Sequence, residues 1–513
     1  MINFAATLDR HAGFWPEKVV LTTRREQVTY AQLLSRANAT AAALASAGVG
    51  EGDIVAVLLQ NRIEFIELIY AVNRLGAAYL PINFRLAPPE WRYIIDHGTA
   101  KAIVTEPEYE SAVAGCLDGL SLTTCLTIGD PQTAFFCSYR SFVEPFLGSQ
   151  VQPVDVDAGA LQRLMYTSGT TAHPKGVRIT HENFCWKNLA LLLQFGWDHT
   201  EVTAVAGPLY HVGALDMGGL ATLHAGGSLV LQPRFDAEDL LALMEEHRAT
   251  NVWLAPAMVN ALLQSPSLRS RDLSALKTIL SGGEKMPESR LHQVLDALPD
   301  VWFADAYGLT ETVSSDTFLD REHMLDKIGS VGKAVLHQQV RIVDGVGQPV
   351  PVGAVGEIVL KGPKVFPGYW RDPAATDAAI RNGWFHTGDM GRLDADGYLY
   401  VEDRKKDMIV SGGENIASPE VERALFEHPS VLEAAVVARP DERWGEVPHA
   451  FIVVREGHVV TSDELIEFCH QRLAKFKVPR EVQFLDALPR TPSGKVLKRD
   501  LRHQVSPTAE SHT

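Results

Sequence analysis

The chain has 513 residues, 46% hydrophobic, 21% charged and 8% aromatic, and these ordinary proportions exclude a disordered chain, a collagen and a coiled coil. The length suffices for about three domain-sized units. Its 63 acidic and 47 basic residues give a formal net charge of −16, which argues against general nucleic-acid binding because that function requires a basic surface.

The N-terminus and the cysteines point to the cytoplasm. The first ten residues lack a basic segment followed by an apolar one, and no apolar run approaches about 18 residues. We therefore expect neither a signal peptide nor a membrane-spanning helix. The five cysteines form no Cys-x-x-Cys pair, which predicts reduced, mostly buried thiols.

The N-terminal third alternates helical and strand patterns. Residues 30–45 and 65–72 repeat apolar side chains at three- and four-residue steps, which predicts amphipathic helices. Residues 54–59 and 102–105 are β-rich runs, typical of strands covered on both faces. Further strands, each after a helical stretch, are expected at residues 228–231, 251–254 and 278–280. The alternation predicts an α/β fold with largely parallel sheets.

The most informative segment, residues 166–177, follows the apolar run that ends at Tyr166. It contains four hydroxyl residues, two glycines and a lysine. Small residues let backbone N–H groups approach a polyphosphate, hydroxyls add donors and lysine adds a point charge. The spacing fits neither G-x-x-x-x-G-K-[ST] nor G-x-G-x-x-G. The expected phosphate-binding residues are Thr167, Ser168, Gly169, Thr170, Thr171 and Lys175.

The pattern changes after residue 330. Strands at 340–343, 356–360 and 398–401 are separated by Gly, Pro and Asp, which indicates a β-rich subdomain resembling a distorted barrel. The charged run that follows suggests a hinge at 403–407. Residues 1–402 would then form an N-terminal domain of two α/β subdomains and the barrel-like subdomain.

A smaller, mobile α+β domain is expected over residues 408–513. Its predicted elements are helices near 419–426 and 462–473 and strands near 432–437 and 450–454. Nine basic residues and three acidic ones lie between residues 471 and 502, so this segment is positively charged whereas the chain as a whole is negatively charged. A solvated basic face would explain this excess, and so would attraction of nucleotide phosphates.

The phosphate loop resembles the T-S-G-T-T-G-x-P-K-G signature of the adenylate-forming superfamily, which includes acyl-CoA synthetases, peptide-synthetase adenylation domains and luciferases. Ala172 stands where the family usually has glycine. The resemblance runs from about Tyr30 to Arg502, with the family's motifs in order. It implies that ATP and a carboxylic acid form an acyl-adenylate and pyrophosphate, after which the thiol of CoA displaces AMP.

The resemblance also implies roles for the nucleotide residues. Residues 306–312 resemble the family's Y-G-x-T-E motif, in which Tyr307 would stack on adenine, Thr310 would contact the α-phosphate and Glu311 would hold Mg²⁺. Residues 384–389 resemble W-x-x-T-G-D, which places Asp389 on the ribose hydroxyls. The remaining nucleotide-binding residues implied here are Gly282, Gly283, Asp305, Ala306 and Arg404.

The C-terminal motif supplies the expected catalytic lysine. Residues 488–495 resemble the family's P-x-T-x-x-G-K segment, in which Lys495 would bridge the substrate carboxylate and the α-phosphate. Lys406 stands at the family's hinge position. Rotation there would withdraw Lys495 and bring in the loop with Gly412 and Gly413, where glycines suit a narrow pantetheine tunnel.

The acyl site is expected near residues 208–215, which resemble the family's P-L-x-H segment. There His211 would act as a gate between the acid and the pantetheine tunnel. Asp216 is expected at a helix start, although relatives that activate amino acids use an acidic residue in this region to hold the amine. Ala306 stands where many relatives have glycine, and its methyl group would narrow the channel.

An acid–CoA ligase is therefore the expected function, with a carboxylic acid, ATP and CoA as ligands. The main alternative is an amide ligase that passes the acyl group to an amine such as an amino acid. A non-catalytic nucleotide-binding protein would not need Lys495 and Glu311, and nothing specific favours light emission. A homodimer is an open alternative for the assembly.

Overall fold

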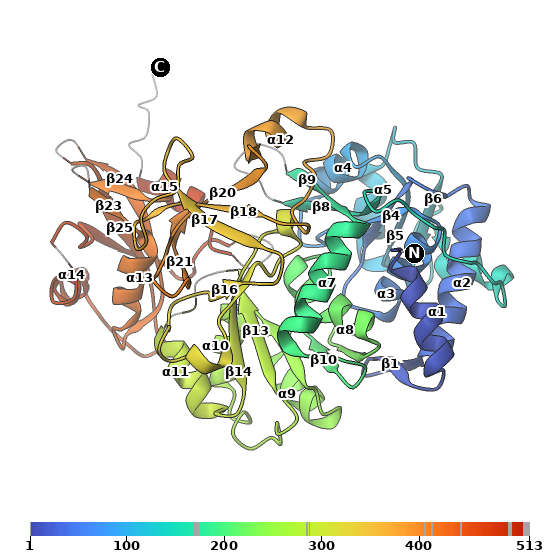
Figure 1. Ribbon diagram of the computed structural model, residues 1–513, viewed down its shortest axis with the longest axis horizontal. Helices are drawn as coiled ribbons and strands as arrows, with labels where there is room; N and C mark the ends of the chain where they lie inside the picture. Colours follow the sequence, from blue (N-terminus) through green and yellow to red (C-terminus); the bar gives the residue numbers. More distant parts are fainter. Residues whose placement is uncertain are drawn as a thin grey trace.

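The computed structural model builds the described part of the chain from four β-sheets with helices packed around them (Figure 1). It describes residues 2–167, 174–283, 286, 288–404, 407–411, 414–441, 444–473, 475–490 and 495–505. Along the long axis, the colours of Figure 1 pass from the blue N-terminal part to the red C-terminal part. The arrangement confirms an α/β fold with a large N-terminal and a small C-terminal part.

A seven-stranded sheet of order β7-β6-β5-β3-β4-β8-β9 forms the first layer. Its strands are β3 (Ile54–Leu58), β4 (Ala78–Pro81), β5 (Ala100–Thr105), β6 (Thr124–Thr127), β7 (Cys137–Ser138), β8 (Leu161–Thr167) and β9 (Lys175–Thr180). Its helices are α2 (Tyr30–Ser46), α3 (Ile63–Arg74), α4 (Pro88–His97), α5 (Pro107–Cys116) and α6 (Tyr139–Val143). The predicted parallel pairing is confirmed, except that β8 and β9 pair antiparallel.

A nine-stranded sheet of order β16-β15-β14-β13-β12-β10-β11-β1-β2 lies beside it. Its strands are β1 (Val19–Thr22), β2 (Gln27–Thr29), β10 (Val202–Val205), β11 (Ser228–Leu231), β12 (Asn251–Leu254), β13 (Thr278–Gly282), β14 (Trp302–Tyr307), β15 (Thr317–Phe318) and β16 (Lys333–Ala334). The helices that pack on it are α8 (Leu220–Ala225), α9 (Ala237–Glu246), α10 (Pro256–Gln264) and α11 (Glu288–Ala297). Helix α1 (Ala5–Phe14) packs on α2 and α3, and α7 (His181–Phe195) packs on β8 and β9 of the seven-stranded sheet. The strands expected near residues 228, 251 and 278 are confirmed as β11, β12 and β13.

The parallel strands β12, β13 and β14 position the site. Neighbouring parallel strands end at the same edge of a sheet, where ligands bind in open α/β folds. Gly282, at the end of β13, therefore lies opposite Ala306 near the end of β14. Two of the segments expected to bind nucleotide, residues 282–283 and 305–307, thus meet at one edge of this sheet.

The β-rich subdomain is an antiparallel five-stranded sheet. Its elements are β17 (Gln339–Val343), β18 (Gly356–Lys361), β19 (Ile380–Arg381), β20 (Trp384–Leu393), β21 (Leu399–Arg404) and α12 (Pro373–Ala379). Among the described strands, β17 pairs only with β18, so the sheet is open and the expected barrel does not close into a ring.

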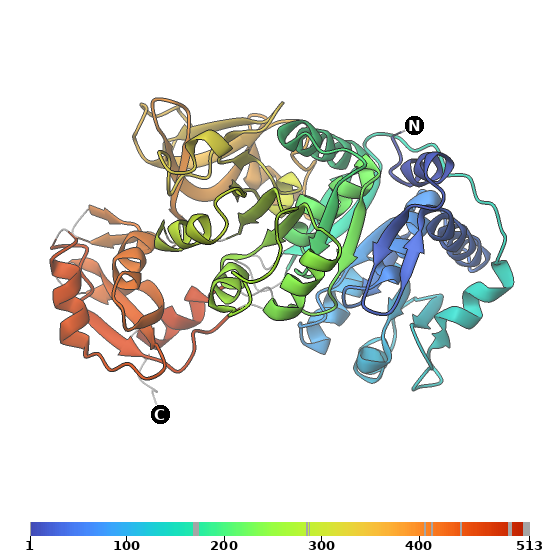
Figure 2. The ribbon, with the colours of Figure 1, turned by 90° about the horizontal axis from the view of Figure 1, so that it is seen from below.

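A separate sheet lies at the C-terminal end of the molecule (Figure 2). Its elements are β22 (Ile409–Ser411), β23 (Glu414–Ile416), β24 (Val431–Asp441), β25 (Gly445–Val454), β26 (Glu481–Phe484), α13 (Ser418–Phe426), α14 (Ser462–His470) and α15 (Lys498–Val505). Helix α14 ends three residues earlier, and strand β25 begins five residues earlier, than the sequence predicts. Arg423 of α13 forms an ion pair of 2.7 Å with Glu288 of α11, which joins this part to the nine-stranded sheet.

Two further sequence expectations concern the cysteines and membrane-spanning helices. All five cysteines are free, as predicted, but only Cys116 and Cys469 are buried and Cys137 is exposed, so the expectation of mostly buried thiols is wrong. None of the described helices combines the length and the apolar character that crossing a bilayer requires.

Candidate active site

The phosphate segment begins and ends in a β-hairpin. β8 ends at Thr167 and β9 begins at Lys175, and these two residues face each other in the antiparallel pair. The strand is therefore followed by a second strand and not by a helix, which explains why the spacing departs from that of P-loops. Ser168, Gly169, Thr170 and Thr171 lie outside the described residues.

Tyr369 connects this hairpin to Glu311. Its ring centroid lies 4.9 Å from the Nζ atom of Lys175, and its hydroxyl donates a hydrogen bond of 2.9 Å to Oε1 of Glu311. The neighbouring Trp370 N–H donates to the carbonyl of Gly176 at 2.7 Å. Sequence reasoning did not single out Tyr369, because a tyrosine after Pro367-Gly368 gives no chemical signal until its partner is known.

The two residues expected at adenine and ribose contact each other. Tyr307, at the end of β14, donates a hydrogen bond of 2.7 Å from its hydroxyl to Oδ2 of Asp389 on β20. Both residues are buried. Burial and the Asp389 carboxylate raise the pKa of Tyr307 well above its usual value, so its hydroxyl stays protonated. Arg404 lies opposite Asp389 in the pairing of β20 with β21.

Two glycines allow the backbone to pack closely at the end of β13. A Cβ atom on Gly282 would lie 2.7 Å from the carbonyl oxygen of Ala306, closer than real Cβ contacts allow. Gly283 has φ +94°, in the region that favours glycine. The buried Asp305 accepts a hydrogen bond of 3.0 Å from the N–H of Ala306. The backbone of both strands is thus closely packed at the predicted nucleotide site.

Lys495 reaches this edge from the other end of the chain. Its Cε atom lies 3.8 Å from the position that a Cβ on Gly283 would occupy. Burial and, after it, the charge of Lys495 lower the pKa of the His211 imidazole. Residues from three distant motifs therefore meet at one place. Lys406, Gly412 and Gly413 lie outside the described residues.

His211 is a neutral imidazole whose Nε2 atom carries the proton. Its Nδ1 atom accepts a hydrogen bond of 3.1 Å from the N–H of Gly213, so in the neutral ring the proton is on Nε2. Burial, together with the charge of Lys495, lowers its pKa to about 4. The indole of Trp253 lies beside it, with ring centroids 6.0 Å apart.

The depressed pKa of His211 predicts the pH dependence of activity. The folded-state pKa lies below the ordinary value, so this histidine gains no proton between pH 8 and about 5.5. We expect kcat/KM for acid-dependent pyrophosphate release to show no ionisation belonging to His211 in this interval. An acidic limb near pH 6.5 that disappears in His211→Gln would contradict this result.

Asp216 has a different role from the one expected at a helix start. It lies within the π-helix Gly213–Gly219, fully buried, and its side chain accepts no capping bond. Its Oδ2 atom pairs with Arg163 at 2.6 Å and its Oδ1 atom with Lys187 at 3.3 Å. Asp216 offsets part of the charge of these two fully buried cations and is therefore not available to hold a substrate amine.

The residues described around Glu311 fit a magnesium ion bound chiefly by phosphate. Glu311 is buried beside Tyr369, and no group of three or more His, Cys, Asp or Glu side chains that could hold a metal occurs within the described ranges. Mg²⁺ commonly binds through one or two carboxylates together with substrate phosphates and water. One protein carboxylate beside a phosphate segment therefore suits this ion.

The basic excess between residues 471 and 502 is largely neutralised. Six of its nine cations form ion pairs with carboxylates among the described residues, which are Arg472–Glu427, Lys477–Glu420, Arg490–Glu433, Lys498–Glu422, Arg499–Asp500 and Arg502–Asp407. All but one of these carboxylates lie outside the segment, so counting along the chain overstated its charge. The surface is much less basic than the sequence suggests.

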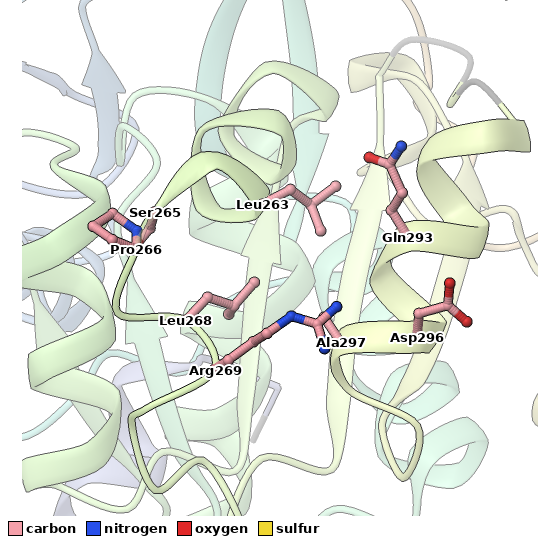
Figure 3. Close-up of a pocket in the computed structure, with 8 residues that line it drawn as sticks. All are labelled: Leu263, Ser265, Pro266, Leu268, Arg269, Gln293, Asp296 and Ala297. Carbon is pink, nitrogen blue, oxygen red and sulfur yellow. The ribbon is translucent and has the colours of Figure 1, made fainter.

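A cavity of about 380 Å³ lies away from all of these residues. Leu263 of α10 and the loop that carries Leu268 and Arg269 line one side, and Gln293 and Asp296 of α11 line the other (Figure 3). It contains none of the residues that the motifs identified. The candidate site is therefore the strand edge with Gly283, His211 and Lys495.

The chain belongs to the AMP-binding enzyme family, whose model matches residues 8–370, and the family's C-terminal domain model matches residues 420–495. A feruloyl-CoA synthase from Amycolatopsis sp is 40% identical over 495 residues, covering 96% of this chain and 97% of that protein. An indoleacetate–CoA ligase from Aromatoleum aromaticum is 37% identical over 503 residues, covering 97% of both. ATP-bound MatB from Rhodopseudomonas palustris has a similar structure, with a TM-score of 0.90, 31% identity and 98% of both chains covered.

Proposed function

We propose that this chain is an acid–CoA ligase that forms AMP. It activates a carboxylic acid with ATP as an acyl-adenylate and then transfers the acyl group to the thiol of CoA. The observation that carries this function is the position of Lys495 beside Gly283 and within electrostatic reach of His211. The two relatives described above, a feruloyl-CoA synthase and an indoleacetate–CoA ligase, support CoA as the acceptor.

In the first half-reaction, Lys495 and His211 position the acid. The ammonium of Lys495 offsets the repulsion between the acid's carboxylate and the α-phosphate, and stabilises the charge that develops at phosphorus. His211 donates from Nε2 to the same carboxylate, since its proton lies on that nitrogen. One carboxylate oxygen bonds to the α-phosphorus, the bond from that phosphorus to the bridging oxygen breaks, and pyrophosphate leaves.

The nucleotide is held by residues from the N-terminal part. Tyr307 stacks on adenine while its hydroxyl keeps Asp389 oriented. Asp389 accepts hydrogen bonds from the ribose hydroxyls, and Arg404 donates to the ribose. Thr310, Thr167 and Lys175 contact the phosphates. Glu311 would hold Mg²⁺, an ion that neutralises phosphate charge when bound.

For the second half-reaction, the C-terminal part turns about a hinge at residues 403–407. Lys495 then leaves, and the loop with Gly412 and Gly413 approaches the tunnel for pantetheine. The ordering of sheets supports this boundary, because β21 and β22 belong to different sheets. The Arg423–Glu288 ion pair would break in this movement; its exposed position makes it worth less than about 1 kcal/mol.

The acid is an aromatic one of modest size. The side chains that support this choice are the flat indole of Trp253 beside His211 and the methyl group of Ala306. The relatives described above are named for feruloyl and indoleacetate substrates, both of which carry an aromatic ring. Aromatic surfaces bind well to one another in offset or edge-to-face contacts.

Pyrophosphate release from ATP tests this function. A panel of hydroxycinnamic, arylacetic, aminobenzoic and aliphatic acids should give acid-dependent release, with the highest kcat/KM among the aromatic acids. Release without any acid, or from none of them, would contradict the activation step. A preference for long aliphatic acids would contradict the acid class while leaving the activation step in place.

A further inference from the structure

The turn that carries Thr310 and Glu311 is followed by a strained segment. Val313, Ser314 and Ser315 all have left-handed backbone conformations, with φ of +55°, +62° and +63°. Each such residue with a side chain costs roughly 1–2 kcal/mol. The segment folds back on the preceding strand, since a Cβ atom on Gly308 would lie 2.3 Å from the N atom of Ser315.

Lys364 holds this segment in place. Its Nζ atom lies 2.6 Å from the carbonyl oxygen of Ser314, 2.7 Å from that of Ser315 and 2.8 Å from Oδ1 of Asp316. All three partners only accept hydrogen bonds, so the contacts require three N–H donors and therefore a charged ammonium. The side chains of Lys364 and Asp316 are almost completely buried.

Asp316 closes the same segment at its other end. Its N–H donates to the carbonyl of Tyr307 at 2.7 Å. Its carboxylate also accepts hydrogen bonds from the hydroxyl of Thr312 and, at 2.8 Å, from Nε2 of Gln338. The loop after β18 adds a backbone contact, because the N–H of Phe366 donates to the carbonyl of Glu311 at 2.7 Å. Residues 307–316 are thus fixed at several points around Glu311.

We propose that Lys364 is a positioning residue that keeps Glu311 oriented toward the metal and the phosphates. This inference rests on the proposed function, which gives Glu311 its metal. Lys364 touches neither substrate nor metal; it stabilises the left-handed segment that holds the Thr310–Glu311 turn. Asp316 neutralises the charge of Lys364, so the role of this ion pair is to fix the conformation of the segment. Replacing such a buried pair by apolar or neutral groups is often neutral for stability.

The Mg²⁺ concentration for half-maximal pyrophosphate release tests the inference in the full-length enzyme. The double variant Lys364→Met with Asp316→Asn removes both charges and leaves no unpaired ion. We expect this concentration to rise about tenfold or more, because loss of a residue that holds a metal ligand in place commonly weakens metal binding by such a factor. If the double variant fails to fold, the single variant Lys364→Gln, which keeps two N–H donors, should still raise the required Mg²⁺ concentration about fivefold.

Two single variants make the result decisive. Arg74→Met removes another buried cation, one that pairs with Asp9 and donates to the carbonyl of Val151, so it should lower the melting temperature without changing the Mg²⁺ requirement. Glu311→Gln should raise the Mg²⁺ requirement. A folded Lys364 variant whose Mg²⁺ requirement stays within about twofold of the parent's would overturn this inference, provided that Glu311→Gln does raise the requirement. The assignment of the metal to Glu311 would then still stand. An unchanged requirement in Glu311→Gln would overturn the metal assignment, and this inference with it.

Discussion

Replacing Lys495 with alanine should slow adenylate formation by about 10²–10³-fold, because a positioned charge at a developing anion contributes roughly 3–4 kcal/mol to the transition state. The same variant should convert a supplied acyl-adenylate and CoA to thioester at close to the parent rate, since the lysine would have left the site for that step. Pyrophosphate release measures the first rate, and thioester formation from synthetic acyl-adenylate measures the second.

A matched control is Arg499→Ala, which removes an exposed cation four residues further along the same domain. It should leave both rates unchanged. Equal losses in both half-reactions of Lys495→Ala would show that the lysine stays at the site throughout. That result would refute the proposed exchange of Lys495 for the glycine loop while leaving the ligase function standing.

Replacing Asp216 with asparagine should lower the free energy of unfolding by about 3–5 kcal/mol, because it leaves Arg163 and Lys187 buried with little compensation. Urea denaturation at constant pH measures this loss. Glu246→Gln, at the exposed end of an ion pair with Arg24, should cost less than about 1 kcal/mol.

The same variant separates two roles for this carboxylate. If Asp216 held a substrate amine, its replacement would leave stability within about 1 kcal/mol and would instead change the preference among amino acids. Such an outcome would contradict the buried network of Arg163, Asp216 and Lys187 and would restore the amine-binding role.

The elements with strong local patterns were predictable from the sequence. The strand at residues 251–254 is an uninterrupted β-rich run, and the helix that begins at Tyr30 follows a threonine cap whose hydroxyl accepts from the N–H of Gln32. Phosphate binding at residues 167–175 stays a prediction from the sequence, which rests on hydroxyls, glycines and a lysine at short spacing. Local chemistry is sufficient where a residue's role depends on its neighbours in the chain.

Contacts between distant residues were not predictable. Tyr369 meets Glu311 across 58 positions and Lys364 meets Asp316 across 48, so neither pair leaves a local pattern. Asp216 was misassigned because its neighbours suggest a helix start, whereas Arg163 and Lys187 reach it from β8 and α7. The charge count over residues 471–502 failed for the same reason, since most of the neutralising carboxylates lie elsewhere in the sequence.

The identity of the acyl product shows whether the enzyme is an AMP-forming acid–CoA ligase. The enzyme is incubated with ATP, Mg²⁺, CoA and an aromatic acid, with and without amino acids, and the products are weighed by mass spectrometry. We expect equal amounts of acyl-CoA, AMP and pyrophosphate, whether or not amino acids are present. An acyl amide formed in place of the thioester, or ADP formed in place of AMP, would contradict this function.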